Sequence, residues 1–162
     1  MNYRKKIILW LFEKSQNIYT KYFKKKEPWQ ILRADLLKYP KNSIGKHLGD
    51  FLLENGFELI PKVERHDAYH VITGYGTNVE DEIALQYLCF GNGKRSKYLF
   101  AVVVIGTFVL PEYYKHYYKS YCIGKKANPF HHYDYKKLLE IDLFDFRRSI
   151  FSYKQLIQLK LY

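Results

Sequence analysis

The sequence predicts an all-α protein: a single compact helical domain over residues 1–162, with about six to eight helices around a buried apolar central helix. Apolar residues recur at three- and four-residue steps along most of the chain, which is the spacing of one helix face. Proline, glycine and capping residues divide the chain into segments of helical length. With 162 residues, 48% of them hydrophobic, the chain is long enough for one such domain.

Periodicity and capping signals predict the first helices. Residues 3–25 form an amphipathic helix with lysines among its apolar positions. This helix packs on the domain in one interpretation and lies on a membrane surface in another, because both need the same pattern. Pro28 is placed to open a second helix that reaches Leu37, and Ser43 is placed to cap a third over residues 44–55.

The middle of the chain predicts three more helices. Residues 65–73 form a short helix that ends at a tight turn of Gly74, Tyr75 and Gly76. Thr77 and Glu80 fit a capping box, so the next helix begins there and runs to about residue 90. The run 98–110 is apolar on every side, so we expect it to be buried. We interpret it as a helix, although its β-branched residues would also suit a strand.

The net charge of +11 favours anionic partners, which include phosphates, nucleic acid and anionic lipid headgroups. Residues 113–121 interleave tyrosines with lysines, a pattern that single-stranded nucleic-acid binders use. On a helix most of these tyrosines share one face and would pack as an amphipathic stripe. Nucleic acid is therefore not the expected partner.

Sequence features also bear on location. Neither Cys89 nor Cys122 occurs in a C-x-x-C spacing, so we expect no disulfide framework and no thiolate zinc site. The apolar run 7–12 ends at once in charged residues and has no small-residue cleavage site. The longest uncharged apolar run is shorter than the roughly 20 residues of a membrane span. We expect a cytoplasmic protein, soluble or peripheral on a membrane, with no signal peptide and no transmembrane helix.

Possible metal ligands gather in the segment 65–82. His66 and His70 are four residues apart, and Asp67 lies three before His70, so on a helix all three project from one face. Two histidines at this spacing hold zinc in H-E-x-x-H metalloproteases. The glycine turn returns the chain into a second helix, which can bring Glu82 to the same ion.

The nature of these residues predicts the cofactor. Glu82 could instead complement the positive end of its helix, but Glu80 already fills that role. Two imidazoles and two carboxylates suit zinc, with iron(II) and manganese as alternatives. We therefore predict a divalent-metal site whose ligands are His66, Asp67, His70 and Glu82. Tyr69 and Tyr75 lie near the predicted ion and are candidate substrate-binding residues.

These residues resemble the signature of a known family. His66-Asp67-x-x-His70, eleven further residues and Glu82 are similar to the H-D-x-x-H-x(11)-E motif of the Coq-four family of ubiquinone biosynthesis. The stretch HDAYHVITGYGTNVEDEIALQ continues the similarity, and Pro40-x-x-Ser43-Ile44-Gly45 resembles an upstream motif of the family. The resemblance is continuous over residues 28–93, the expected metal-motif core.

The resemblance implies a helical protein that associates peripherally with membranes and handles polyprenylated quinone precursors. It implies that His66, Asp67, His70 and Glu82 bind the metal. The implied activity is that of a metal-dependent lyase, an oxidative decarboxylation at ring carbon one of a prenylated hydroxybenzoate-type precursor. The alternative is a non-catalytic prenyl-lipid-binding scaffold that organises other biosynthetic enzymes at the membrane. Either way, the expected partners are a prenyl lipid, a membrane surface and those enzymes.

Overall fold

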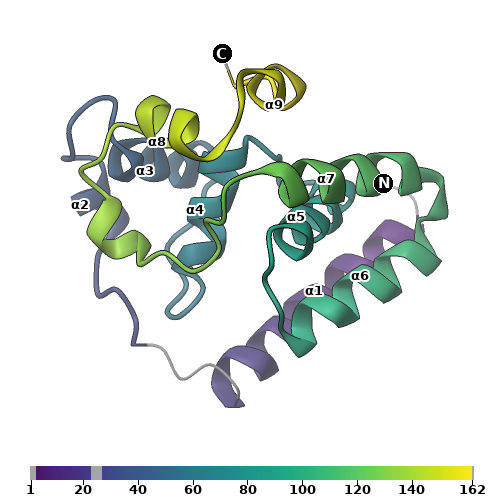
Figure 1. Ribbon diagram of the computed structural model, residues 1–162. Helices are drawn as coiled ribbons and strands as arrows, with labels where there is room; N and C mark the ends of the chain where they lie inside the picture. Colours follow the sequence, from purple (N-terminus) through teal and green to yellow (C-terminus); the bar gives the residue numbers. More distant parts are fainter. Residues whose placement is uncertain (1–2, 23–26, 162) are drawn as a thin grey trace. The chain divides into compact units, whose positions relative to one another are not determined.

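The computed structural model describes residues 3–22 and 27–161 of the chain. Over these residues it contains nine α-helices, two 3-10 turns and no strand, which confirms the predicted all-α fold class (Figure 1). In chain order the elements are α1 Tyr3–Tyr22, α2 Arg33–Leu36, α3 Ile44–Glu54, α4 Glu64–Thr73, α5 Val79–Gly91, α6 Lys97–Val109, η1 Pro111–Tyr113, α7 Tyr114–Lys126, η2 Tyr135–Leu138, α8 Leu143–Ile150 and α9 Tyr153–Gln158.

The described residues divide into two compact units. The first contains α1 together with Tyr75–His132, and the second contains residues 27–74 together with residues 133–161. The chain therefore leaves the second unit after α4 and returns to it after α7. The expectation of a single domain over residues 1–162 stays a prediction.

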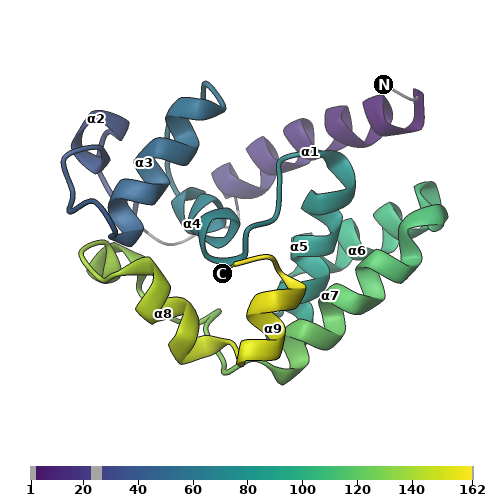
Figure 2. The ribbon, with the colours of Figure 1, turned by 90° about the horizontal axis from the view of Figure 1, so that it is seen from above.

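In the first unit α5 is the central buried helix. α6 and α7 both pack against it (Figure 2), and α1 contacts both α5 and α6. Glycines permit the close approach of α5 and α7: a Cβ atom at Gly124 would lie 2.0 Å from the Leu88 carbonyl oxygen, and one at Gly91 would lie 2.2 Å from that of Tyr121. Any larger residue at either position would force the two helices apart.

The cap of α5 differs from the predicted one. Asn78, not Thr77, is the N-cap, and its side-chain oxygen accepts a hydrogen bond of 3.0 Å from the Asp81 N–H. Asparagine caps as well as or better than threonine, so the helix begins one residue later than the capping box predicted. α1 follows the predicted helix 3–25 through Tyr22, and the last three predicted residues lie outside the described part of the chain.

The run 98–110 is a helix, as predicted, but its expected burial on every side is wrong. α6 buries only Leu99, Val102 and Gly106. α5 and α1 pack against α6, and the helical repeat carries the remaining apolar side chains away from these contacts. The exposed positions recur every three or four residues: Lys97, Phe100, Ala101, Val104, Ile105 and Phe108. The apolar helix that is buried in this unit is α5.

In the second unit the capping prediction for α3 is confirmed, whereas the helix predicted from Pro28 is not. Ser43 Oγ accepts a hydrogen bond of 3.1 Å from the Lys46 N–H, and α3 begins at the next residue. Residues 27–32 are not helical, and Gln30 has a φ of 56°, which no right-handed helix contains. The Trp29 N–H donates to buried Glu64 at 3.0 Å, which ties this segment to the first turn of α4.

Helix α4 ends as the glycine turn predicted. Gly74 has a φ of 72°, a left-handed conformation that suits glycine at a helix end. The guanidinium of Arg147, on α8, donates to the Val71 and Ile72 carbonyl oxygens at 2.6 and 3.1 Å. These two carbonyls belong to the last turn of α4, which has no further helical donors for them. Arg147 thus secures the end of the helix that carries the histidines.

Within the described residues no single helix is long and apolar enough to cross a membrane. α6 and the segment Pro111–Lys126 reach that length and composition only as a pair, bent by 103° at their junction.

Candidate metal centre

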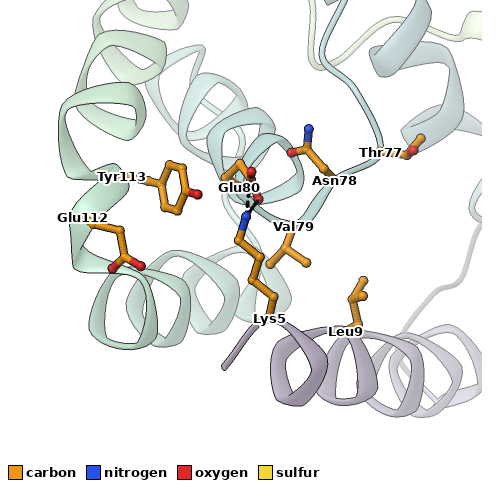
Figure 3. Close-up of a pocket in the computed structure, with 8 residues that line it drawn as sticks. All are labelled: Lys5, Leu9, Thr77, Asn78, Val79, Glu80, Glu112 and Tyr113. Atoms are coloured by element: carbon orange, nitrogen blue, oxygen red, sulfur yellow. Dashed lines mark hydrogen bonds and ion pairs between the residues drawn. The ribbon is translucent and has the colours of Figure 1, made fainter. Parts of the chain in front are cut away.

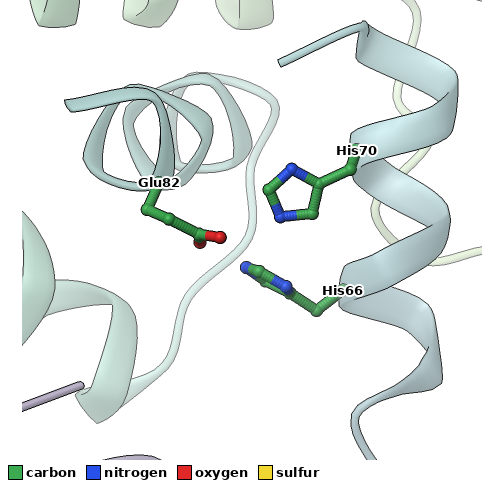
Figure 4. A group of neighbouring side chains, drawn as sticks. All are labelled: His66, His70 and Glu82. Atoms are coloured by element: carbon green, nitrogen blue, oxygen red, sulfur yellow. The ribbon is translucent and has the colours of Figure 1, made fainter. Parts of the chain in front are cut away.

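His66 and His70 project from the same side of α4, one helical turn apart (Figure 4). Their ring centroids are 4.7 Å apart and the planes lie at 72°, an edge-to-face arrangement. The spacing of four residues produces this pairing, because neighbouring turns of a helix place such side chains one above the other. The two rings share one helix face, as the sequence predicted, and their role as ligands of one ion stays a prediction.

The surroundings of the two histidines differ. His70 is 3% exposed, and its ring stacks on Phe51 of α3 with centroids 5.5 Å apart and planes at 13°. His66 is only partly buried. Packing therefore holds the ring of His70 in place before any ligand binds, which reduces the entropy that ordering it would cost.

Asp67 lies beside His66 and is partly buried. Its Oδ1 is 3.9 Å from His66 Nδ1, too far for a hydrogen bond and near enough for an attraction when the imidazole is charged. A histidine that binds a metal through one ring nitrogen commonly donates a hydrogen bond from the other to a neighbouring carboxylate. A small rotation would let Asp67 serve in this way or bind an ion itself. Its role as a ligand stays a prediction.

Glu82 lies in the first turn of α5, in the other unit, and is partly buried. The neighbouring Asp81 is engaged elsewhere: its Oδ1 accepts a hydrogen bond of 2.9 Å from His116 Nε2 on α7. That hydrogen bond holds the pKa of Asp81 below its ordinary value, while partial burial opposes the shift. Adjacent residues of a helix point to different sides of it, so Asp81 pairs with α7 while Glu82 points elsewhere.

Among the described residues, the group whose chemistry could hold a metal ion consists of His66, His70 and Glu82. Two imidazole nitrogens and a carboxylate oxygen form the donor set of many catalytic zinc sites, and it also suits iron(II). Asp67 is outside this group. The donor set fits a divalent metal and does not select the element.

The two predicted substrate-binding tyrosines are engaged within the protein. Tyr69 is fully buried on α4, and its ring meets that of Tyr135 edge to face at 5.5 Å. The Tyr75 hydroxyl donates a hydrogen bond of 2.6 Å to Ser120 Oγ. Burial raises the pKa of Tyr75 well above its ordinary value, so the hydroxyl keeps its proton. A role in substrate binding stays a prediction for both residues.

Two residues on the Glu82 side of α5 were not predicted as site residues. Gln86 lies one turn after Glu82 and is buried, and Cys89 lies one turn further on and is fully buried. Burial raises the pKa of the Cys89 thiol. The signal for Gln86 was present in the sequence, since it is the polar residue within a stretch of α5 that is otherwise apolar from Ile83 onward.

A cavity of about 540 Å³ lies in the first unit, between α1 and the N-terminus of α5 (Figure 3). Lys5 reaches into it, forms an ion pair of 2.8 Å with Glu80, and lies 4.9 Å from the centre of the Tyr113 ring. None of the predicted site residues lines this cavity. Its lysine is already neutralised by Glu80, so the cavity does not offer a free charge to an anionic ligand.

Fold and side-chain chemistry together define a class: an all-helical protein that carries a histidine pair on α4 and a glutamate in the first turn of α5. Residues 59–153, more than half of the chain, match the family described as Coenzyme Q (ubiquinone) biosynthesis protein Coq4. The chain belongs to this family, which confirms the resemblance found in the sequence and implies a role in ubiquinone biosynthesis.

A solved structure shares the fold. It is the crystal structure of a proposed ubiquinone biosynthesis protein from Nostoc punctiforme PCC 73102, which aligns with a TM-score of 0.63 over 92% of this chain and 81% of that one. The two sequences are 17% identical over the alignment, so the similarity bears on the fold alone. No protein with a curated function matches the sequence.

Proposed function

We propose that this protein binds one divalent metal ion through His66, Asp67, His70 and Glu82 and acts on a polyprenylated aromatic precursor of ubiquinone. The observation that carries the proposal is the edge-to-face pair of His66 and His70 on one face of α4, whose ring centroids are 4.7 Å apart. Family membership supplies the pathway. We propose zinc as the ion, with iron(II) and manganese as alternatives that the same donor set fits.

The proposed reaction is the removal of the carboxyl group at ring carbon one. The bond between that carbon and the carboxyl carbon breaks, carbon dioxide leaves, and a hydroxyl group takes its place. With dioxygen as the oxidant, a two-electron donor and two protons balance the step, and water is the second product. A divalent metal at this site supplies a Lewis acid for the oxygen atoms of the head group.

The residues of the chain have separate tasks in this proposal. His70, fixed by its stack on Phe51, sets the direction from which ligands reach the ion. Asp67 holds the second nitrogen of His66 or joins the coordination. Tyr69 and Tyr75 are proposed to face the head group, and for Tyr75 this requires exchange of its Ser120 partner for the ligand.

We further propose that the exposed face of α6 docks on a membrane, the source of a prenylated substrate. Phe108 is 82% exposed and Phe100, Val104 and Ile105 are also exposed, with Lys97 at the start of the same face. Apolar side chains beside a lysine are what an interfacial helix presents to anionic lipid. The net charge of +11 favours anionic lipid over neutral lipid for the protein as a whole.

The alternative is a non-catalytic scaffold that binds a prenyl lipid and organises biosynthetic enzymes. The exposed α6 face suits that role equally. The two functions differ at the metal, because structural zinc sites are closed whereas catalytic sites keep a position open for water or substrate. Turnover that depends on the metal supports the enzyme, and lipid binding without turnover supports the scaffold.

The decisive first measurement is the metal content of the purified protein beside three variants. We expect about one ion per chain in the wild type, as in mononuclear sites. His66→Ala and Glu82→Ala should lose it, and His47→Ala, an exposed histidine on α3, should keep it. Wild-type protein that holds no ion after zinc, iron(II) or manganese is supplied would contradict the proposed site.

The second measurement tests the chemistry. Detergent micelles that contain a prenylated 4-hydroxybenzoate, with dioxygen and a two-electron donor, should yield carbon dioxide and the ring-hydroxylated product. His70→Ala should abolish both the bound metal and the turnover while most of the helical content remains. Turnover that persists in protein stripped of metal would exclude the metal-dependent mechanism.

A further inference from the structure

We propose that Gln86 is a ligand-contacting residue of the metal site, whose side-chain oxygen accepts a hydrogen bond from an O–H or N–H group of the molecule bound to the ion. The inference rests on the proposed function, because it takes Glu82 as a ligand of that ion. It adds a selection rule: the bound molecule must bring a hydrogen-bond donor next to the atom that coordinates the metal.

The first observation is an unpaired polar atom in the interior. Gln86 is 3% exposed, and its Oε1 is buried without a hydrogen-bond partner among the described residues. Buried side-chain oxygens are almost always paired, since burial removes the hydrogen bonds that water would provide. An acceptor in this position suits a ligand that brings a hydrogen-bond donor.

The second observation is the position of Gln86 on α5. It lies four residues after Glu82, so the two side chains project from the same side of the helix, about 5–6 Å apart at their Cβ atoms. Other positions of α5 face the neighbouring helices of the unit. Ile83 lies against Gly106 of α6, and the Leu88 backbone lies against Gly124 of α7.

The surroundings of Gln86 favour a single strong contact. Leu85 and Cys89, the neighbours of Glu82 and Gln86 on this side of α5, are both fully buried. Hydrogen bonds strengthen where water is excluded, so one donor placed here would gain more than at the surface. Sites built to pair with a substrate O–H or N–H discriminate strongly against analogues that lack it.

In the orientation that the structure shows, the amide oxygen selects what can bind. A carbonyl oxygen only accepts, so a carboxylate oxygen or an ether cannot satisfy it. A ring hydroxyl, an N–H group or a metal-bound water can. For an aromatic ligand, Gln86 would therefore select a hydroxyl group close to the oxygen that binds the metal.

A pair of small metal-binding probes tests this rule without turnover. Acetohydroxamate chelates a metal and keeps an N–H group, whereas N-methylacetohydroxamate chelates in the same way and lacks it. Both are titrated against protein loaded with cobalt(II), and the visible absorption of cobalt reports binding. We expect the wild type to prefer acetohydroxamate about tenfold, the size of one good hydrogen bond in affinity.

The variants Gln86→Met and Gln86→Leu keep a side chain of similar volume and remove the acceptor. Both should retain cobalt and lose the preference between the two probes. The thermal midpoint of the metal-free protein should stay the same or rise, because the unpaired oxygen is gone. Two variants are used so that a packing defect specific to one side chain does not decide the result.

The outcomes separate this inference from the proposed function. Wild-type protein that does not bind cobalt(II) overturns the metal site, and with it the role of Gln86. Wild-type protein that binds cobalt but shows no preference, or a preference that survives in both variants, overturns the role of Gln86 alone. A fall of several degrees in the midpoint of both metal-free variants would show that Oε1 has a structural partner, and would also overturn it.

Discussion

The Tyr75 hydroxyl donates a hydrogen bond of 2.6 Å to Ser120 Oγ, and so ties the glycine turn after α4 to the middle of α7, 45 residues further along the chain. The Ser120 hydroxyl in turn donates a hydrogen bond of 2.8 Å to the His116 carbonyl oxygen. Ser120 is fully buried and Tyr75 nearly so. The turn that precedes Glu82 is therefore held by a buried pair of hydroxyl groups.

This pair predicts an asymmetry between two variants. Ser120→Ala removes the acceptor of a buried hydroxyl and should lower the free energy of unfolding by about 1–3 kcal/mol. Tyr75→Phe removes the donor and should cost less, about 1 kcal/mol. Urea unfolding measures both, together with the double variant. Costs that add fully in the double variant would show that the two hydroxyls do not interact.

Gly74 ends α4, and Gly56, which follows α3, is a matched control for it. Both have a left-handed backbone, with φ of 72° and 68°, so alanine at either should cost about 1–2 kcal/mol of folding free energy. A Cβ atom at Gly74 would also lie 2.6 Å from Leu161 Cδ2, whereas one at Gly56 meets nothing within 4 Å. Gly74→Ala should therefore be the more destabilising in thermal unfolding, and equal effects would show that Leu161 yields freely.

Arg147 should matter for the histidine helix although it lies on α8. Arg147→Met removes two hydrogen bonds from a charged, partly buried donor to the last turn of α4, and should cost about 2 kcal/mol. Arg148→Met, at the exposed neighbouring position, should change stability by less than about 0.5 kcal/mol. Chemical denaturation compares the two, and metal titration shows whether the loosened helix also binds the ion less tightly. Equal stabilities would argue that the α4 carbonyls do not need Arg147.

The two cysteines should differ in reactivity. Cys89 is fully buried, and burial raises the pKa of its thiol, whereas Cys122 is only partly buried. The thiolate is the reactive form, so iodoacetamide should label Cys122 in the folded protein and reach Cys89 only after unfolding. Mass spectrometry of the labelled peptides gives the answer. Rapid labelling of Cys89 in the native protein would show that its side of α5 opens.

The α6 face predicts how the protein meets lipid. Phe108→Asp should lower binding to vesicles of anionic phosphatidylglycerol about tenfold, because it removes an inserting ring and adds repulsion. Phe108 is 82% exposed, so the fold should change little. Tyr153→Asp, at a position 76% exposed in the other unit, is the control and should bind as the wild type does. Equal binding by both variants would exclude α6 as the lipid-binding face.

Local signals in the sequence were sufficient for most helices and for the histidine pair. Ser43 caps α3, Gly74 ends α4, and the four-residue step from His66 to His70 places both rings on one face. Each of these results depends on neighbours within one or two turns, so the sequence displays it directly. Where two local signals competed, as for Thr77 and Asn78, the start of the helix moved by one residue.

Tertiary structure decided the features that depend on residues far apart in the chain. An apolar pattern shows that α6 must be stabilised by contacts, but only the packing of α1 and α5 determines which face remains exposed. The hydrogen bonds from Arg147 to α4 join residues that are separated by 75 and 76 positions in the chain. That Gln86 Oε1 has no partner among the described residues is likewise visible only after the neighbouring donors have been placed. The sequence by itself determined the helical class and the shared helix face of His66 and His70, because both follow from local spacing, whereas burial and hydrogen-bond partners follow from the whole fold.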